Sequence, residues 1–207
     1  RSTLFPYTTL FRSRTGAVEW LDRPRPMLIL MHGASGSGKS WLSEQLVPNF
    51  PALRIRSDIE RKRFVRHADP RQSNDLYAPE VSHRTYARLL ECGESVMQAG
   101  FSAIVDATFL NPIDRELFRD LAHRLQCAYA IVSCHADTPT LTQRIEARAR
   151  EAANPSDADR RVLAMQLSSM LPFPEDERPD VIFADTRQPL VVRHVNSALQ
   201  AKVSSLP

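Results

Sequence analysis

The sequence has no apolar run that could cross a membrane, because no stretch approaches the roughly 18 consecutive apolar residues of a membrane helix. It also has no block of Lys and Arg, so a net charge of +3 over 207 residues argues against a nucleic-acid or anionic-membrane partner. Only three cysteines occur, without a CxxC pair, and the six histidines show no metal-ligand spacing. These patterns indicate neither a disulfide framework nor a zinc site. No secretory signal is visible, so we expect a cytoplasmic protein.

The first residues differ in character from the rest. Thr3 to Ser13 read TLFPYTTLFRS, which looks like the in-frame translation of a sequencing adapter, and the chain does not begin with Met. We therefore interpret residues 1–13 as an artefact, with a genuine extended segment as the alternative. Without Arg1 and Arg12, the only charged residues there, the net charge falls from +3 to +1. Residues 14–26 are polar and contain two prolines, which is typical of a linker, so we expect one domain over residues 27–207.

Short apolar runs alternate with helical patterns along this domain. Residues 27–31, 52–55, 101–105, 128–133 and 180–184 are expected strands, and the stretches between them carry helix signals such as Asn111 before Pro112. A capping box of Ser57 and Glu60 is expected to begin the helix after the second strand, and one of Ser156 and Asp159 a later helix. Strands separated by helices predict an α/β fold with a mainly parallel five-stranded sheet and helices on both faces. Ligands of such sheets bind beyond the carboxyl ends of the strands.

A phosphate-binding pattern follows the first strand. Residues 33–40 read GASGSGKS and fit GxxxxGK[ST], between a strand and a helix. Glycines allow the backbone amides to surround a phosphate, Lys39 can reach the β- and γ-phosphates, and the Ser40 hydroxyl can bind Mg²⁺. A flexible Gly/Ser turn is the alternative, which the strand and helix on either side disfavour. We expect ATP and Mg²⁺ as cofactors, with the nucleotide bound by Gly33, Ala34, Ser35, Gly36, Ser37, Gly38, Lys39, Ser40 and Trp41.

Two carboxylates follow later strands. Asp58, just beyond the second strand, can accept the proton of an acceptor hydroxyl, and Arg61 one turn later can bind an anionic substrate or the transferred phosphate. Asp106 ends the third strand, where a carboxylate can order Mg²⁺ directly or through water. The alternatives are structural: Asp58 can simply favour the first turn of a helix, and Asp106 a turn at a strand end.

An arginine-rich helix is expected after the fourth strand, in the sequence LTQRIEARAR. Arg144 and Arg148 are four residues apart and project from one face, so the pair can close over ATP and neutralise charge on the γ-phosphate. We expect this helix to form a lid. A solvated helix face explains the same pattern without a function.

The segments MHGASGSGKS, RIRSDIERKR and AIVDATFL together resemble the P-loop ATP-binding domains identified as AAA-family ATPases, which often follow an aminoglycoside-phosphotransferase-like domain in one bacterial polypeptide. They are also similar to the kinase domain of phage polynucleotide kinase, to zeta toxins and to gluconate-kinase-like enzymes. The resemblance extends from about Met27 to Asp185. It implies a three-layer, nucleoside-kinase-like P-loop NTPase fold, and it implies that residues 14–26 link to such an upstream domain.

The resemblance also implies individual roles. Lys39 and Ser40 match the Walker-A pair, Asp58 the general base, Arg61 an acceptor-side arginine, Asp106 the Walker-B-like acid, and Arg144 or Arg148 the lid arginine. Trp41 departs from the family, in which Thr is frequent at this position. No sensor or arginine-finger segment of the ring-forming AAA+ proteins can be placed, so the family label says little about mechanism.

Three functions fit these residues. The first is an ATP-dependent kinase that phosphorylates a hydroxyl of a small molecule or nucleotide, such as a sugar, a nucleoside sugar, an antibiotic or a nucleic-acid 5′ end. The near-neutral charge disfavours the last of these acceptors. The second is an ATP-binding or ATPase module that regulates a partner domain, and the third is a zeta-toxin-like nucleotide-sugar kinase.

Overall fold

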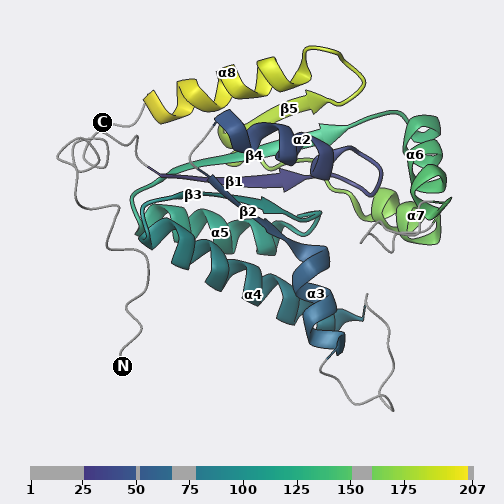
Figure 1. Cartoon of the computed structure of the whole chain (residues 1–207), viewed down its shortest axis with the longest axis horizontal. Helices are drawn as coiled ribbons and strands as arrows, with labels where there is room; N and C mark the ends of the chain where they lie inside the picture. Colours follow the sequence, from purple (N-terminus) through teal and green to yellow (C-terminus); the bar gives the residue numbers. More distant parts are fainter. Residues whose placement is uncertain (1–25, 50–51, 67–77, 151–159, 205–207) are drawn as a thin grey trace, which may run out of the picture.

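The computed structural model describes residues 26–49, 52–66, 78–150 and 160–204. Within these ranges, five strands form one sheet in the spatial order β2-β3-β1-β4-β5 (Figure 1). All neighbouring strands are parallel. The strands are β1 (Met27–His32), β2 (Ala52–Arg56), β3 (Ser102–Asp106), β4 (Ala128–His135) and β5 (Val181–Asp185). The expected adapter segment and linker, apart from Pro26, lie outside the described residues.

Helices connect the strands and cover both faces of the sheet. In the described ranges they are α2 (Lys39–Leu46), α3 (Ser57–Arg66), α4 (Pro79–Gln98), α5 (Pro112–Arg124), α6 (Thr138–Arg150), α7 (Arg160–Ser169) and α8 (Val191–Ser204), with short 3-10 turns η2 (Val47–Asn49) and η3 (Arg178–Asp180). In Figure 1, α2 and α8 lie on one face, α4 and α5 on the other, and α6 and α7 lie beyond the carboxyl ends of the strands.

Strand β1 shows why the sheet must be covered on both faces. All six of its residues are buried, and successive side chains point to opposite faces. Met27, Ile29 and Met31 pack in the core cluster with α2 and α8, whereas Leu28 and Leu30 pack in the cluster with α4 and α5. A continuously apolar strand of this kind is stable only between two helical layers. The predicted three-layer α/β fold is therefore confirmed.

Local signals gave most boundaries within one or two residues. The side chain of Asn111 accepts a hydrogen bond from the backbone N–H of Ile113 at 3.1 Å, which confirms the expected N-cap of α5. Strand β3 begins at Ser102 rather than at Phe101, because the N–H of Phe101 still donates to the carbonyl of Val96 at the end of α4. Strand β2 continues one residue further than expected, to Arg56.

The expected capping box at α3 has another arrangement. Glu60 is buried, and its carboxylate lies 2.7 Å from Arg63 Nη1 and 3.8 Å from Arg88 Nε. Its side chain thus pairs with arginines of α3 and α4, because burial of a carboxylate favours a charged partner over a backbone amide. The second expected capping pair, Ser156 and Asp159, lies outside the described residues. Among the described helices, none is both long and apolar enough to span a membrane.

Candidate functional site

The glycine-rich loop between β1 and α2 adopts a conformation that requires its glycines. Gly36 and Gly38 have φ values of 81° and 86°, in the left-handed region that other residues rarely adopt. At Gly33, with φ 135°, a Cβ atom would lie 2.3 Å from the carbonyl oxygen of Cys134. The N–H of Gly33 donates to the carbonyl of Thr108, so the loop also contacts the segment after β3. The pattern GxxxxGKS therefore forms a compact loop at the carboxyl end of the central strand.

Lys39 lies over this loop. Its Nζ donates to the carbonyl of Ala34 at 2.8 Å and to the hydroxyl of Ser37 at 3.4 Å, and the side chain is buried. Burial lowers the pKa of Lys39, an effect that the nearby charge of Asp106 opposes. An ammonium group with only neutral hydrogen-bond acceptors is poised to exchange them for the oxygens of a phosphate, which bind it more strongly.

A cavity of about 920 Å³ opens beside the loop. It is lined by residues of the loop, α2, β2, α3, β3, α6 and the segments that follow β3 and β5. These residues are Ser35, Gly36, Gly38, Lys39, Ser40, Trp41, Glu44, Arg54, Arg56, Ser57, Asp58, Asp106, Ala107, Thr108, Arg144, Ala147, Arg148 and Thr186. Most of the candidate residues from the sequence are among them. Gly33, Ala34 and Ser37 are buried within the loop itself, and Arg61 is not in the lining.

Asp58 faces this cavity from the first turn of α3 and is half-buried. Burial raises the pKa of the Asp58 carboxyl, and the negative charge of Asp106 raises it further. Positive charges nearby oppose these effects, and they include Arg61, one turn further along α3. A carboxyl group with a raised pKa beside a phosphate-binding loop is suited to take a proton.

Asp106 is the last residue of β3 and is 5% exposed. Its Oδ2 accepts a hydrogen bond from Nη2 of Arg54 at 2.6 Å and from the Ser43 hydroxyl at 3.3 Å. The same Nη2 atom donates to the carbonyl of Ser40 at 2.8 Å. An arginine of the edge strand therefore joins the Asp106 carboxylate to α2, the helix that follows the glycine-rich loop. Sequence reasoning missed Arg54, although RIR within a strand places Arg54 and Arg56 on one face.

The oxygen groups at this end of the cavity fit a magnesium ion that is shared with a nucleotide. Ser40 contributes a hydroxyl and Asp106 a carboxylate, and both line the cavity. In the part of the chain that the structure describes, no group of three or more His, Cys, Asp or Glu residues could hold a metal ion. Mg²⁺ binds through one or two protein oxygens, substrate phosphates and water, so a complete protein cage is not required.

Arg144 and Arg148 both reach the cavity from α6. Arg144 Nη1 donates to the Thr186 hydroxyl at 2.8 Å and to the carbonyl of Gly36 at 3.3 Å, and Nη2 donates to the carbonyl of Thr186 at 3.2 Å. The positive charge of Arg148 helps to lower the pKa of Lys39. The two arginines thus line the same cavity from α6, consistent with the shared face that their spacing predicts, and Arg144 contacts the loop directly.

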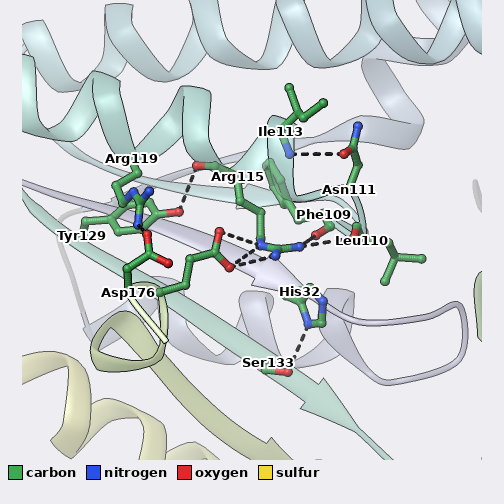
Figure 2. Close-up of polar contacts among 11 residues, drawn as sticks. His32, Phe109, Leu110, Asn111, Ile113, Arg115, Arg119, Tyr129, Ser133 and Asp176 are labelled. Atoms are coloured by element: carbon green, nitrogen blue, oxygen red, sulfur yellow. Dashed lines mark hydrogen bonds and ion pairs between the residues drawn. The ribbon is translucent and has the colours of Figure 1, made fainter. Parts of the chain in front are cut away.

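A buried ion pair outside the cavity supports the segment after β3. Arg115 of α5 is 1% exposed and donates to both carboxylate oxygens of Glu177, at 2.7–3.2 Å. Its Nη1 donates to the carbonyls of Phe109 and Leu110, and Figure 2 shows the guanidinium directed at these two groups. Phe109 has a φ of 48°, so the chain turns sharply there. Arg115 therefore fixes the loop whose Thr108 contacts Gly33, and no sequence pattern indicates the pair of Arg115 and Glu177.

Comparisons with known proteins agree with this geometry. A family model described as an AAA domain matches residues 28–173. A search of curated proteins gives no match. Among solved structures, a candidate kinase from Chloroflexus aurantiacus has a TM-score of 0.68 at 19% identity, covering 86% of this chain and 98% of that one. A gluconokinase from Sinorhizobium meliloti 1021 has a TM-score of 0.61 at 24% identity, with 89% and 97% covered. Kti12 from Chaetomium thermophilum, in complex with ADP-AlF3, has a TM-score of 0.61 at 14% identity, with 86% and 99% covered.

These structural likenesses, all below 25% identity, show the P-loop kinase-like fold alone. The family model covers more than half of the 207 residues. The chain belongs to the AAA domain family.

Proposed function

We propose that the protein is an ATP-dependent kinase that transfers the γ-phosphoryl group of ATP to a hydroxyl of a small molecule or nucleotide. The observation that carries this proposal is the position of Asp58, a half-buried carboxylate with a raised pKa in the same cavity as Lys39. A module that only binds nucleotide needs the loop and Lys39, but it has no need for a base facing the phosphates. Kinase folds among the structural neighbours, including the gluconokinase, support the same reaction class.

Each group of residues in the cavity has its own role in the proposed reaction. Backbone amides of the loop and Lys39 bind the β- and γ-phosphates, and Ser40 and Asp106 would hold Mg²⁺. When bound, Mg²⁺ neutralises negative charge on the β- and γ-phosphate oxygens. Asp58 takes the proton of the acceptor hydroxyl, and the acceptor oxygen forms a bond to the γ-phosphorus of ATP. The bond between the γ-phosphorus and the bridging β-phosphate oxygen breaks, and ADP leaves. Arg144 and Arg148 stabilise the charge that develops on the transferred group.

The basic residues near Asp58 bear on the acceptor. Arg56 lines the cavity. The positive charges of Arg61 and Arg56 both oppose the rise in the pKa of Asp58 that burial causes, so these two arginines lie close to that carboxylate. Two arginines beside the base favour an acceptor that carries a carboxylate or phosphate as well as the reacting hydroxyl. Gluconate, the acceptor that the name of the structural neighbour implies for that enzyme, is of this kind.

The test is ATP turnover by the full chain with Mg²⁺, measured with a panel of sugar acids, sugars, nucleosides, aminoglycosides and 5′-hydroxyl oligonucleotides. Asp58→Asn should abolish acceptor-dependent turnover and leave ADP binding intact. Asp114→Asn is a matched control, because burial also raises the pKa of Asp114 but this residue lies on α5 outside the cavity lining. ATP binding without stimulation by any acceptor, and without a difference between the variants, would instead favour a regulatory ATP-binding module.

A further inference from the structure

Arg54 has an unusual position for a residue of an edge strand. Its side chain is only 15% exposed, although β2 is the outermost strand on its side of the sheet. The guanidinium extends across the neighbouring strand and contacts Asp106 at 2.6 Å and the carbonyl of Ser40 at 2.8 Å. Asp106 and Ser40 are the two residues expected to hold Mg²⁺, and the guanidinium contacts the carboxylate of the first and the backbone carbonyl of the second.

Both hydrogen bonds that the described residues donate to the Asp106 carboxylate are accepted by the same oxygen, Oδ2. A carboxylate oxygen accepts at about two lone-pair positions. Oδ2 of Asp106 already accepts from Arg54 and from the Ser43 hydroxyl. A metal ion needs a free lone pair at about 2.0–2.1 Å, and a guanidinium at the same oxygen repels it electrostatically. Mg²⁺ at this carboxylate therefore competes with the guanidinium of Arg54.

Of the two donors, Arg54 is the one that can move. Ser43 is 0% exposed on α2, and its single hydroxyl proton is shared between the carbonyl of Ser40 at 3.0 Å and Asp106 Oδ2 at 3.3 Å. Arg54 borders the cavity, and within the described residues its buried Nε has no hydrogen-bond partner. A guanidinium with an unsatisfied donor has hydrogen-bonding capacity to gain by turning toward phosphate oxygens in the cavity.

We propose that Arg54 is a positioning residue that occupies Asp106 when the cavity holds no metal–nucleotide complex, and that it competes with Mg²⁺ for this carboxylate. The proposal rests on the kinase function above, because it assumes that a nucleotide and Mg²⁺ enter together. Binding of the complex moves the guanidinium from Asp106 toward the phosphates. The contact with Arg54 thereby raises the Mg²⁺ concentration that binding to Asp106 requires.

Direct binding measurements on the full chain test the competition without relying on turnover. Mn²⁺, a spectroscopic substitute for Mg²⁺, is titrated at saturating ADP and followed by electron paramagnetic resonance, and ADP binding is measured by calorimetry with and without Mg²⁺. Arg54→Met keeps the aliphatic stem and removes the charged donor. Arg56→Met is the matched control, because it removes one positive charge from the same cavity wall but not the charge that contacts Asp106.

The dissociation constant for Mn²⁺ should fall by about tenfold or more in Arg54→Met, the effect of losing one charge-assisted hydrogen bond that competes for the ligand. The dissociation constant of Arg56→Met should remain close to that of the wild type. Arg54→Lys should have a dissociation constant between those of Arg54→Met and the wild type, so this variant tests the proposal if Arg54→Met does not fold. An equal change in both Met variants, or weaker Mn²⁺ binding in Arg54→Met, would overturn the competition while leaving the kinase proposal intact. ADP binding by the wild type that is indifferent to metal would overturn both.

Discussion

Removing Glu177 should destabilise the protein severely, although this residue lies outside the cavity. Its carboxylate is the charged partner of Arg115, and the two side chains are 6% and 1% exposed. Glu177→Ala leaves the guanidinium in the interior without a counter-ion. Since a guanidinium does not lose its proton in proteins, the charge cannot be removed by titration.

The magnitude follows from the geometry. Arg115 donates to Glu177 through Nε and Nη2 and to two backbone carbonyls through Nη1. Breaking a buried pair by removing one partner costs about 3–5 kcal/mol, a large share of the roughly 5–15 kcal/mol that holds a domain folded. Replacing both residues, as in Arg115→Met with Glu177→Leu, removes the isolated charge but leaves the carbonyls of Phe109 and Leu110 without this donor. The double variant should therefore lose less stability than the two single changes added together.

The assay is urea unfolding at pH 7, with the free energy of unfolding obtained by linear extrapolation. Asp176→Ala is the matched control one residue away. Asp176 pairs with Arg119 at 2.7 Å, but its side chain is 65% exposed, so its loss should change the free energy of unfolding little. A cost for Glu177→Ala as small as that of Asp176→Ala would refute the reasoning, because it would mean that water reaches Arg115.

Four further outcomes follow from the site and its surroundings. Lys39→Ala should lower ATP turnover by about 10²-fold or more, because it removes the only ammonium group within the loop, and a fluorescent ADP analogue would report the accompanying loss of affinity. Burial raises the pKa of Asp58, so the acidic limb of the pH–rate profile should lie above the ordinary range of a carboxyl group, with activity falling as Asp58 gains its proton; a limb in the ordinary range would contradict this assignment. Burial lowers the pKa of His32 to about 3, so between pH 6.5 and pH 3 the imidazole is protonated in the unfolded chain but not in the folded one. The free energy of unfolding should therefore fall by about 1.4 kcal/mol for each pH unit in this range because of this group, and in urea unfolding His32→Gln should remove that part of the decline. Gly36→Ala should weaken nucleotide binding, because its Cβ would lie 2.7 Å from a backbone carbonyl of α6 at a φ of 81°, whereas Gly93→Ala, with neighbours no closer than 3.9 Å, should bind normally in the same titration.

The elements that could be predicted from the sequence are those set by local signals. An unbroken apolar run such as Met27–Met31 requires burial on both faces, and a cap such as Asn111 fixes where a helix begins. The proximity of the candidate residues after β1, β2 and β3 could also be predicted, because the carboxyl ends of parallel strands lie at one edge of the sheet. Asp58 and Asp106 therefore face the same cavity as the loop.

The partners of these residues could not be predicted in the same way. Arg54 is 52 residues from Asp106, and Arg115 is 62 residues from Glu177. An ion pair over such a separation depends on which strands are neighbours and on their register, and a single sequence contains no periodicity that encodes either. Glu60, which was expected to pair with Ser57, has one partner of each kind: Arg63 at 2.7 Å is local on α3, whereas Arg88 at 3.8 Å is brought near by α4 only in the folded chain.

The register of β2 against β3 determines which positive side chain lies beside Asp106. The sequence motif around Asp106 does not contain this information. Arg56 is directly opposite Asp106, and Arg54 is opposite Ile104, two residues earlier on the same face. A long side chain can reach its diagonal neighbour across strands, and Arg54 does so toward Asp106. A shift of one residue in this register would turn both arginines to the opposite face and leave Asp106 without its guanidinium partner. The strand order β2-β3-β1 therefore supplies a countercharge to Asp106, and a metal ion that binds this carboxylate would meet a guanidinium already 2.6 Å from Oδ2.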